Sequence, residues 1–476
     1  MSQNPRQDSL QNFYDHAAPQ REKWIRRNQA FYNDDRAYMR FLIPEGLRIL
    51  ELGCGTASLL GELKPSSGVG VDLSPAMIEQ AQKNWPNYEY VIGDIEDPSV
   101  LAGLEGPFDV VVLSDLLGNL SDVQQTLGRV HKLCTPSTRI IIAYYSPLWE
   151  PILRFGQTFG MRMPQPELTW LSSRDVIEFL ELADFEPIKS EWRQLLPKRL
   201  LGIGTLINRY LSPFPGIRAL CLRHYVVARP RPDTTPAKLS ATVLVPCRNE
   251  KGNIEQAVTR LPDFCEDLEI LYVEGGSSDG TLEECERVRD AYPDVDIKVF
   301  KQPGKGKGDA VRKGFDEARG DVLIILDADL TVPPEQIPKF YDAIVNGKGE
   351  FINGTRFVYP MESGAMRFLN YWANRTFSVI FSWLLNQRFT DTLCGTKVLQ
   401  EKHYKQIVAN RSYFGEFDPF GDFDLIFGAA KLNLKITEIP IRYADRTYGE
   451  TQISRFRHGV LLLKMVMFAF RKLKAF

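Results

Sequence analysis

A chain of 476 residues, 44% hydrophobic and 25% charged, has the composition of a globular protein and is long enough for two or three domains. Its formal net charge of −2 gives no reason to expect a nucleic-acid partner. The opening residues lack the apolar segment of a signal peptide, no apolar run reaches the roughly 18 residues that span a bilayer, and the seven cysteines form no C-x-x-C pair. We therefore expect reduced thiols and a cytoplasmic location.

A glycine-rich turn near residue 54 is the first informative motif. Residues 48–60, RILELGCGTASLL, predict a short strand, a tight turn and the start of a helix. Gly53 and Gly55 permit the turn and let a ligand approach the backbone. A second strand ends at Asp72, at the spacing from which an acid reaches a ribose diol. Ser58 takes the last position of a G-x-G-x-x-G pattern, so we expect a nucleoside ligand without a diphosphate.

These segments resemble the motifs of class I S-adenosylmethionine-dependent methyltransferases. ELGCGTA is similar to the first motif of that family, VDLSPAMIEQA to the second, Gly93-Asp94-Ile95 to the third, and the strand ending in Ser114-Asp115 to the fourth. The resemblance implies a Rossmann-like sheet with S-adenosylmethionine as cofactor. It further implies that Glu51, Gly53 and Gly55 contact the methionine part of the cofactor and that Asp72 contacts the ribose. Asp94 and Ile95 are expected to contact the adenine, and Asp115 is expected to lie near the sulfonium.

The residues do not identify a base for methyl transfer. The segment after the fourth motif has Gly118 and Asn119 where many small-molecule methyltransferases have histidines. We interpret His131 as a surface or packing residue, and His16 and Tyr14 near the amino terminus stay unassigned. The apolar stretch Arg199–Leu220 is interpreted as interdomain packing, with an acceptor cover and a membrane contact as alternatives.

A proline-rich stretch divides the chain. Residues 229–239 contain three prolines and no apolar periodicity, which is typical of a linker. Strand and helix patterns alternate on both sides of it. We therefore predict two α/β domains, residues 1–230 and 240–476, joined by a linker at 231–239.

Strand and turn patterns restart after the linker. Residues 239–250, LSATVLVPCRNE, predict a strand followed by a polar turn that contains Pro246, Asn249 and Glu250. The next strand runs into EGGSSDGT, where Glu274 can accept hydrogen bonds from a nucleobase and Asp279 can cap the following helix. A glycine-rich stretch with several lysines, including Lys307, then suits a diphosphate.

Two carboxylates one residue apart follow the next strand. Val322–Leu326 is an unbroken apolar run, which favours a buried parallel strand that carries Asp327 and Asp329 at its carboxyl end. Such a pair can share a Mg²⁺ or Mn²⁺ ion whose other ligands are diphosphate oxygens and water. Pro333 and Pro334 then end the strand and begin a helix.

Together these segments resemble family 2 glycosyltransferases of the GT-A fold over nearly all of residues 240–455. VPCRNE is similar to the family's P-x-x-N-E motif and Asp327-Ala328-Asp329 to its D-x-D motif, whereas Glu274-Gly275 stands where paired aspartates are usual. DADLTVPPE, NGTR and DTLCGTK are similar to segments of dolichyl- and polyprenyl-phosphate sugar transferases, with Thr331 in a glutamine position. The resemblance implies inverting transfer, a divalent ion on the two aspartates, and a nucleotide-sugar donor bound by Pro246, Asn249, Glu250, Glu274, Asp279, Lys307 and Asp327.

The nature of the sugar acceptor stays open. A phosphate monoester on a lipid is already nucleophilic at neutral pH and needs arginines, for which Arg356, Arg367 and Arg446 are candidates. A hydroxyl group would need a general base, for which Asp424 is the candidate. From Arg446 onward, basic residues flank the apolar run Val460–Phe470, which suits either an anionic membrane surface or docking on its own domain.

The sequence therefore predicts a bifunctional enzyme, cytoplasmic or peripheral at the inner face of the cell membrane. One domain is expected to transfer a sugar to a lipid-linked or other hydrophobic acceptor, and the other to methylate a small molecule or glycolipid. The rival hypothesis keeps the glycosyltransferase but gives it a hydroxyl acceptor on a glycan or metabolite. In that case the first domain is a catalytically inactive, S-adenosylmethionine-binding regulator.

Overall fold

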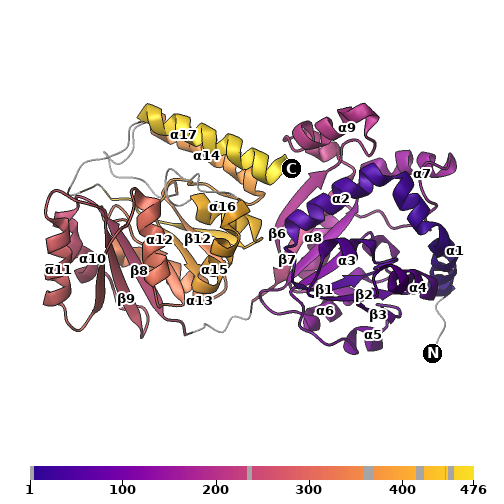
Figure 1. Cartoon of the computed structure of the whole chain (residues 1–476), viewed down its shortest axis with the longest axis horizontal. Coiled ribbons are helices and arrows are strands. Elements are labelled where there is room, and N and C mark those ends of the chain that lie inside the picture. The colour runs from indigo at the N-terminus through magenta and orange to yellow at the C-terminus, as the bar shows by residue number, and fades with distance from the viewer. Residues whose placement is uncertain are drawn as a thin grey trace. The chain divides into compact units, whose positions relative to one another are not determined.

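Two seven-stranded sheets organise the chain in the computed structural model shown in Figure 1. The structure describes residues 5–232, 238–358, 368–413, 423–444, 446, 448 and 455–475. One unit extends to Arg231 and includes Lys474 and Ala475, and the other extends from Pro232 to Leu473. The prediction of two α/β domains is confirmed.

The first sheet is mostly parallel and has the strand order β3-β2-β1-β4-β5-β7-β6. Strands β1 to β5 run parallel, and β7 runs antiparallel to both β5 and β6. The strand bounds are β1 Arg48–Leu52, β2 Ser67–Asp72, β3 Glu89–Ile92, β4 Val110–Ser114, β5 Arg139–Tyr145, β6 Phe185–Arg193 and β7 Arg223–Pro230. Because β4 and β5 are buried on both faces, they are continuous apolar runs.

Helices connect these strands and bring the amino-terminal segment to the sheet edge. Ser74 starts α4 by accepting a hydrogen bond from the N–H of Met77 at 3.1 Å, and Pro75 occupies the first turn. Helix α1 packs on α4 and therefore lies near the carboxyl end of β2. The helix bounds are α1 Pro5–Arg27, α2 Gln29–Leu42, α3 Ser58–Leu63, α4 Pro75–Asn84, α5 Pro98–Ala102, α6 Val123–Val130, α7 Glu150–Thr158, α8 Ser173–Leu182 and α9 Ile203–Leu206.

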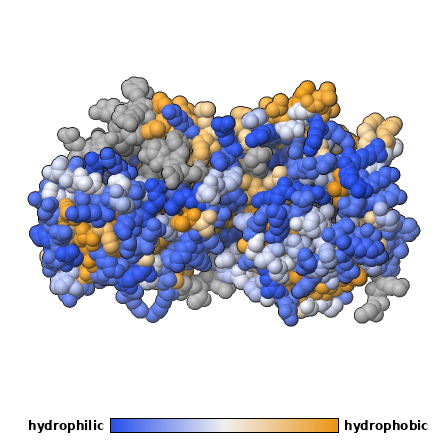
Figure 2. Space-filling model, viewed as in Figure 1, coloured by the Kyte–Doolittle hydropathy of each residue, from blue (hydrophilic) through white to orange (hydrophobic). Residues whose placement is uncertain are grey.

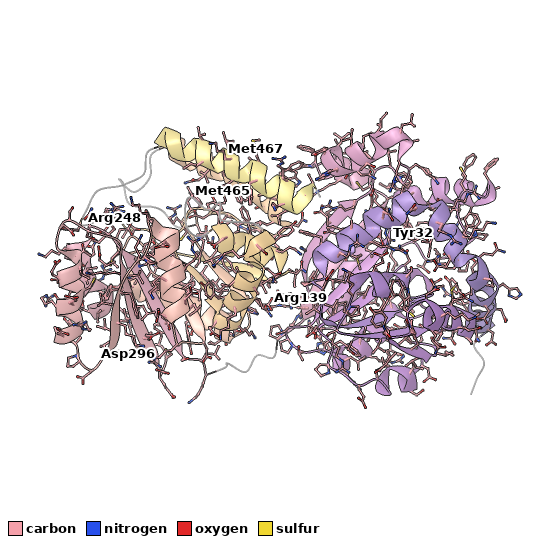
Figure 3. The ribbon with its side chains drawn as sticks, in the orientation of Figure 1. Tyr32, Arg139, Arg248, Asp296, Met465 and Met467 are labelled. Carbon is pink, nitrogen blue, oxygen red and sulfur yellow. The ribbon has the colours of Figure 1, made fainter. Side chains whose placement is uncertain are left out.

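The second sheet has the order β10-β9-β8-β11-β13-β12-β14. Strands β8 to β11 run parallel, whereas β13 runs antiparallel to β11 and β12. Figure 3 labels Asp296, the first residue of β10, and Arg248, which follows the carboxyl end of β8. The strand bounds are β8 Ala241–Cys247, β9 Leu268–Glu274, β10 Asp296–Lys301, β11 Val322–Ile325, β12 Phe351–Thr355, β13 Lys397–Gln400 and β14 Ile436–Pro440.

Helices of the second unit pack on this sheet, with α12 on β8 and β9 and α13 on β12 and β13. As the two prolines predict, a 3₁₀ turn at Pro334–Gln336 leads into α13. The helix bounds are α10 Ile254–Thr259, α11 Thr281–Ala291, α12 Lys307–Glu317, α13 Ile337–Val345, α14 Phe368–Leu385, α15 Glu401–Ala409, α16 Phe423–Lys431 and α17 Arg455–Ala469.

The apolar carboxyl-terminal helix α17 packs along α14. Met465 is buried, whereas Met467 is exposed, and Figure 3 labels both. Val460 and Leu463 are also exposed, so one face of α17 docks on its own unit while another presents apolar side chains to solvent. None of the described helices combines the length and the apolar character needed to cross a bilayer.

Candidate active sites

A cavity of about 330 Å³ lies at the carboxyl ends of β1, β2 and β4 in the first unit. Gly53 and Gly55 line it with φ angles of 71° and 53°, and a Cβ on Gly53 would lie 2.8 Å from Cδ1 of Leu116. Glycine is therefore required at Gly53 both for the backbone and for space. Asp72 holds this turn, because its Oδ2 accepts from the N–H of Gly55 at 2.7 Å and its Oδ1 from the N–H of Ser74 at 2.9 Å.

Asp94, Ile95 and Asp115 line the same cavity. Burial raises the pKa of Asp94, whose Oδ1 accepts from the N–H of Glu96 at 2.9 Å. Asp115 forms an ion pair with Arg223, a fully buried residue that also donates to Asp35 at 3.0 Å. Arg223 was not predicted from the sequence; the available signal was a charged residue shortly before the apolar run Tyr225–Ala228.

Glu51 does not line the cavity. It lies beneath the glycine-rich turn, where its Oε2 accepts a hydrogen bond from the N–H of Leu60 at 3.1 Å. Burial raises the pKa of Glu51 to about 8, so its carboxyl group is largely protonated at neutral pH. The structure therefore brings together the other six predicted cofactor residues and places Glu51 behind them.

Aromatic and basic side chains form another wall of the cavity. This wall was not predicted from the sequence. Arg21 lies with its guanidinium carbon 5.9 Å from the ring centre of Tyr32, and Arg162 lies 4.7 Å from that of Tyr145. Within the described part of the chain, neither arginine forms an ion pair with a carboxylate. Tyr14 donates to Oδ1 of Asn119 at 3.3 Å, and burial raises the pKa of Tyr14 to about 12.

Neither histidine considered from the sequence belongs to the described lining of this cavity. His16 lies on α1 with its Nδ1 2.7 Å from the carbonyl oxygen of Asn12. His131 packs against Phe185, with 5.1 Å between the ring centres, as expected for a packing residue.

In the second unit, Asp327 and Asp329 follow β11 at the carboxyl edge of the sheet. Oδ1 of Asp327 lies 2.5 Å from Nζ of Lys307 at the start of α12. Gly395 makes room for this carboxylate, because a Cβ there would lie 1.6 Å from Oδ2 of Asp327. Burial raises the pKa of Asp327, but Lys307 and more distant basic groups outweigh burial and hold that pKa below its ordinary value.

Asp329 contacts an arginine from a distant part of the chain. Its Oδ2 accepts from Arg446 at 2.6 Å, and Arg446 also donates to Oε1 of Glu250 at 3.2 Å. The hydroxyl of Thr331 donates to Oδ1 of Asp329 at 2.8 Å. Burial raises the pKa of Glu250 to about 6, although Arg446 opposes that rise.

The two turns after β8 and β9 are hydrogen-bonded to each other. The N–H of Asn249 donates to Oγ of Ser277 at 2.9 Å, and the N–H of Ser277 donates to the carboxylate of Glu274. Pro246 lies within β8, and Asp279 lies just before α11. The structure thus gathers the predicted donor-binding residues at neighbouring strand ends.

Arg356 and Asp424 lie in separate ion-pair clusters. Arg356 makes a bidentate contact with the buried Asp391, at 2.6 and 2.7 Å. Oδ2 of Asp424, at the start of α16, lies 3.6 Å from Nε of Arg411 and 4.0 Å from Nη1 of Arg312. The remaining candidate, Arg367, lies outside the described residues.

The donor set fits a hard divalent cation. Asp327 and Asp329 offer carboxylate oxygens and Thr331 a hydroxyl, which are ligand types that Mg²⁺ and Mn²⁺ prefer. The described residues contain no cluster of three or more acidic, histidine or cysteine side chains suited to a metal. Any remaining ligands would therefore come from a bound diphosphate and water.

These two sites define a protein with two ligand-binding α/β domains, each with its site at the carboxyl ends of parallel strands. A family model described as a methyltransferase domain matches residues 24–190, and one described as glycosyl transferase family 2 matches residues 242–414. The chain therefore carries a methyltransferase domain followed by a family 2 glycosyltransferase domain.

Curated relatives match the second domain. A dolichol-phosphate mannosyltransferase of Pyrococcus furiosus is 39% identical over 122 residues, which are 25% of this chain and 34% of that protein. Glycosyltransferase AglJ of Haloferax volcanii is 28% identical over 231 residues, 48% of this chain and 71% of that protein. The chain thus spans about a third of the first relative's length and a larger share of the second.

Solved structures resemble each half. An S-adenosylmethionine-dependent methyltransferase of Thermotoga maritima is 15% identical with a TM-score of 0.37, covering 46% of this chain and 99% of its own. Glucosyl-3-phosphoglycerate synthase of Mycobacterium tuberculosis, solved with Mn²⁺ and uridine diphosphate, is 15% identical with a TM-score of 0.36, covering 49% of this chain and 80% of its own.

Proposed function

We propose that the second domain, residues 240–476, transfers a sugar from a nucleotide-sugar donor to a lipid-linked acceptor such as a polyprenyl phosphate. The observation that carries this proposal is the acidic pair Asp327 and Asp329 after β11, which form ion pairs with Lys307 and Arg446, respectively. The match to the glycosyl transferase family 2 model and the similarity to dolichol-phosphate mannosyltransferases support it.

The donor would lie along the ends of β8, β9 and β11. Glu274 and Asn249 would contact the nucleoside part, and Lys307 would contact the diphosphate; their location at neighbouring strand ends supports this assignment. A Mg²⁺ or Mn²⁺ ion on Asp327 and Asp329 would supply a positive charge that stabilises the departing diphosphate. In a single displacement, an acceptor oxygen bonds to the anomeric carbon as the bond to the diphosphate breaks, which inverts the configuration there.

Arg446 has a further role in this proposal. Its guanidinium group contacts both Asp329 and Glu250. With Asp329 as a ligand of a divalent ion, Arg446 would be available to phosphate oxygens, which guanidinium groups bind well.

A phosphate acceptor fits the surroundings of Asp424 better than a hydroxyl acceptor. Asp424 faces two arginines, and only 12% of its side chain is exposed, so it has limited access to an acceptor hydroxyl. Arg312 and Arg411 are also suitable partners for a phosphate monoester. Arg356 acts at a distance in this scheme, since its positive charge helps to keep Asp327 ionised.

We propose that the first domain, residues 1–230, binds S-adenosylmethionine and methylates a small molecule or glycolipid. Asp72 would hold the ribose, Asp94 and Ile95 the adenine, and the turn at Gly53 and Gly55 the methionine part. The match to the methyltransferase family model supports this assignment. Exposed apolar residues on α17 support peripheral association of the chain with the inner face of the cell membrane.

Incubation of the pure protein with labelled nucleotide-sugars and a lipid extract tests the glycosyltransferase directly. Product masses are measured with and without S-adenosylmethionine. The double variant Asp327→Asn/Asp329→Asn should lose sugar transfer, whereas Asp294→Asn, an exposed aspartate of the same domain, should retain it. Unchanged turnover in the double variant would refute the metal-assisted mechanism.

The variant Asp424→Asn separates the two acceptor classes. Retained turnover is expected for a phosphate acceptor, and near-total loss would favour the hydroxyl of a glycan or metabolite. Calorimetric binding of S-adenosylmethionine without any methylated product in a cell extract would favour the rival view, in which the first domain is an inactive regulator.

A further inference from the structure

An exposed apolar surface lies beside the methyltransferase cavity, and part of it lines the cavity. It consists of α7 with the residue after it and of residues 200–220, and we call it the apolar rim; its main members are Ile152, Phe155, Phe159, Leu201, Ile203 and Leu206. We propose that the apolar rim docks on an anionic lipid bilayer. The methyl acceptor would then be an amphiphile that enters the cavity from the membrane, and this second part rests on the proposed methyltransferase function.

The exposure of these side chains is unusual for a folded domain. Helix α7 buries none of its residues, although its sequence contains Ile152, Leu153 and Phe155. Leu201 is fully exposed, and Leu206 is 59% exposed. Figure 2 shows hydrophobic residues gathered over α9, which begins at Ile203. Exposed apolar side chains gathered in this way mark a surface that binds a partner or a membrane.

Backbone conformation keeps the apolar residues outside. Leu200 and Leu201 have φ angles of 43° and 57°, in a region that residues with a side chain rarely adopt. Two hydrogen bonds between the side chain of Asn208 and the backbone of Leu196, at 2.9 and 2.7 Å, hold residues 196 and 208 together on either side of these leucines. Strain of this kind at two exposed leucines is not explained by packing within the domain and points to a bound environment.

The charge of the segment selects an anionic surface. Residues 195–222 contain four basic residues, Lys198, Arg199, Arg209 and Arg218, and no aspartate or glutamate. Among the described residues, none of the four forms an ion pair with a carboxylate. Exposed leucines and aromatics interleaved with unneutralised basic residues are the composition of segments that lie in the headgroup region of anionic membranes.

The apolar rim is continuous with the cavity. Ile152 is more than half exposed and also lines the cavity, together with Leu153, Pro197 and Lys198. The two parts of the rim are joined, because the indole N–H of Trp149 donates to the carbonyl oxygen of Leu220 at 2.8 Å. A bilayer bound to this face would therefore meet the open end of the cavity.

The cavity wall then indicates which lipid group is methylated. Arg21 and Arg162 favour an acceptor that carries negative charge, and the neighbouring rings of Tyr32 and Tyr145 favour an adjoining apolar or ring-shaped part. An amphiphile with an acidic head satisfies both requirements and would be delivered from the surface that the rim binds.

Vesicle sedimentation of the full chain tests the docking surface. Vesicles of phosphatidylcholine with phosphatidylglycerol are compared with phosphatidylcholine alone, in the absence of S-adenosylmethionine. The wild-type protein should prefer the anionic vesicles, and Leu201→Asp/Leu206→Asp should lower the partition coefficient about tenfold or more, because two apolar groups become anions. The matched control is Leu182→Asp, whose side chain is 60% exposed in the same domain but lies outside the rim; it should bind as the wild type does.

Three results would overturn the proposal. Equal vesicle binding by the rim variant and the control would show that the rim does not dock. A fall in the unfolding temperature of the lipid-free rim variant, without one in the control, would show that protein packs on the rim. A wild-type dimer that the rim variant disrupts, with vesicle binding unchanged, would assign the rim to a second copy.

Calorimetry with S-adenosylmethionine separates this proposal from the proposed function. The rim variant should bind the cofactor with the wild-type affinity, since no substituted residue lines the cavity. Vesicle binding without cofactor binding would leave the docking surface standing and refute the methyltransferase assignment. Labelled methyl transfer from S-adenosylmethionine should appear in vesicle lipids with the wild type and fall about tenfold with the rim variant.

Discussion

Replacing Glu51 by glutamine should make the first domain less sensitive to rising pH. The pKa of Glu51 is raised from its ordinary value of 4.5 to about 8 because the carboxyl group is buried beneath the glycine-rich turn. Between these two values the unfolded chain releases the proton while the folded chain keeps it. The native state therefore loses stability as pH rises from about 4.5 to about 8, and the loss is complete above the folded pKa.

The size of the effect follows from the two pKa values. A difference of about 3.5 at about 1.4 kcal/mol per pH unit gives a ceiling of about 5 kcal/mol. Local relaxation and water penetration reduce such penalties, so we expect about 2–3 kcal/mol between pH 5.5 and pH 8. Glutamine keeps an oxygen that can accept from the N–H of Leu60 and has no proton to lose.

Urea unfolding at several pH values measures this difference. The transition of the first domain is the one that S-adenosylmethionine shifts to higher urea. The free energy of unfolding of Glu51→Gln relative to wild type should rise steadily with pH, whatever constant offset the amide introduces. The exposed Glu79, whose pKa Lys83 lowers, provides the control Glu79→Gln, which should show no such rise. A difference between Glu51→Gln and wild type that is the same at pH 5.5 and pH 8 would refute the reasoning.

Three further predictions concern the two sites. Gly395→Ala should reduce sugar transfer about 100-fold, because its Cβ would displace the carboxylate of Asp327 by an ångström or more, and a loss below threefold in kcat/KM would contradict this. If ionisation of Glu250, whose pKa is about 6, sets the acidic limb of the pH–rate profile for sugar transfer, Arg446→Ala should move that limb to higher pH by about one unit, because Arg446 lowers the pKa of Glu250. An unmoved or acid-shifted limb would show that Glu250 does not govern it. Asp72→Asn should raise the Kd for S-adenosylmethionine about 10- to 100-fold in calorimetry, and an unchanged Kd would remove Asp72 from the ribose site.

Local sequence patterns predicted the strands and turns that form both sites, because each pattern depends only on residues that are neighbours in the sequence. The apolar run before Asp327 forms β11, and the glycines after β1 adopt the positive φ angles that their turn requires. The strand ends then gather acids at one edge of each sheet, as parallel topology demands. Asp72 and Asp327 were predicted from such patterns without any knowledge of tertiary contacts, whereas Asp94 was predicted only from the resemblance to methyltransferase motifs.

Partners supplied by distant segments could not be predicted in this way. Arg446 reaches Asp329 across 117 positions, and Arg223 reaches Asp115 across 108, so neither pair leaves a periodic signal in the sequence. Glu51 also follows a family motif yet lies behind the cavity, because alternation along β1 directs its side chain toward α3. Which face of a strand meets the ligand depends on packing that the motif alone does not record.

The chemistry of the cavity bears on whether the two domains share a product. A sugar hydroxyl needs a base to become a methyl acceptor, and the described lining contains no histidine, while Tyr14 with a pKa near 12 stays protonated. Asp115 is neutralised by Arg223, and Asp72 and Asp94 are assigned to the cofactor. The remaining acidic lining residue is Glu96, whose Oε1 already accepts from the N–H groups of Ser121 and Asp122 at 2.9 and 2.8 Å. The methyl group should therefore go to an oxygen or nitrogen that is nucleophilic without help, such as a carboxylate held by Arg21. If the product of sugar transfer is also the methyl acceptor, it must carry such a group, and mass spectrometry should place the methyl group there and not on a hydroxyl of the transferred sugar.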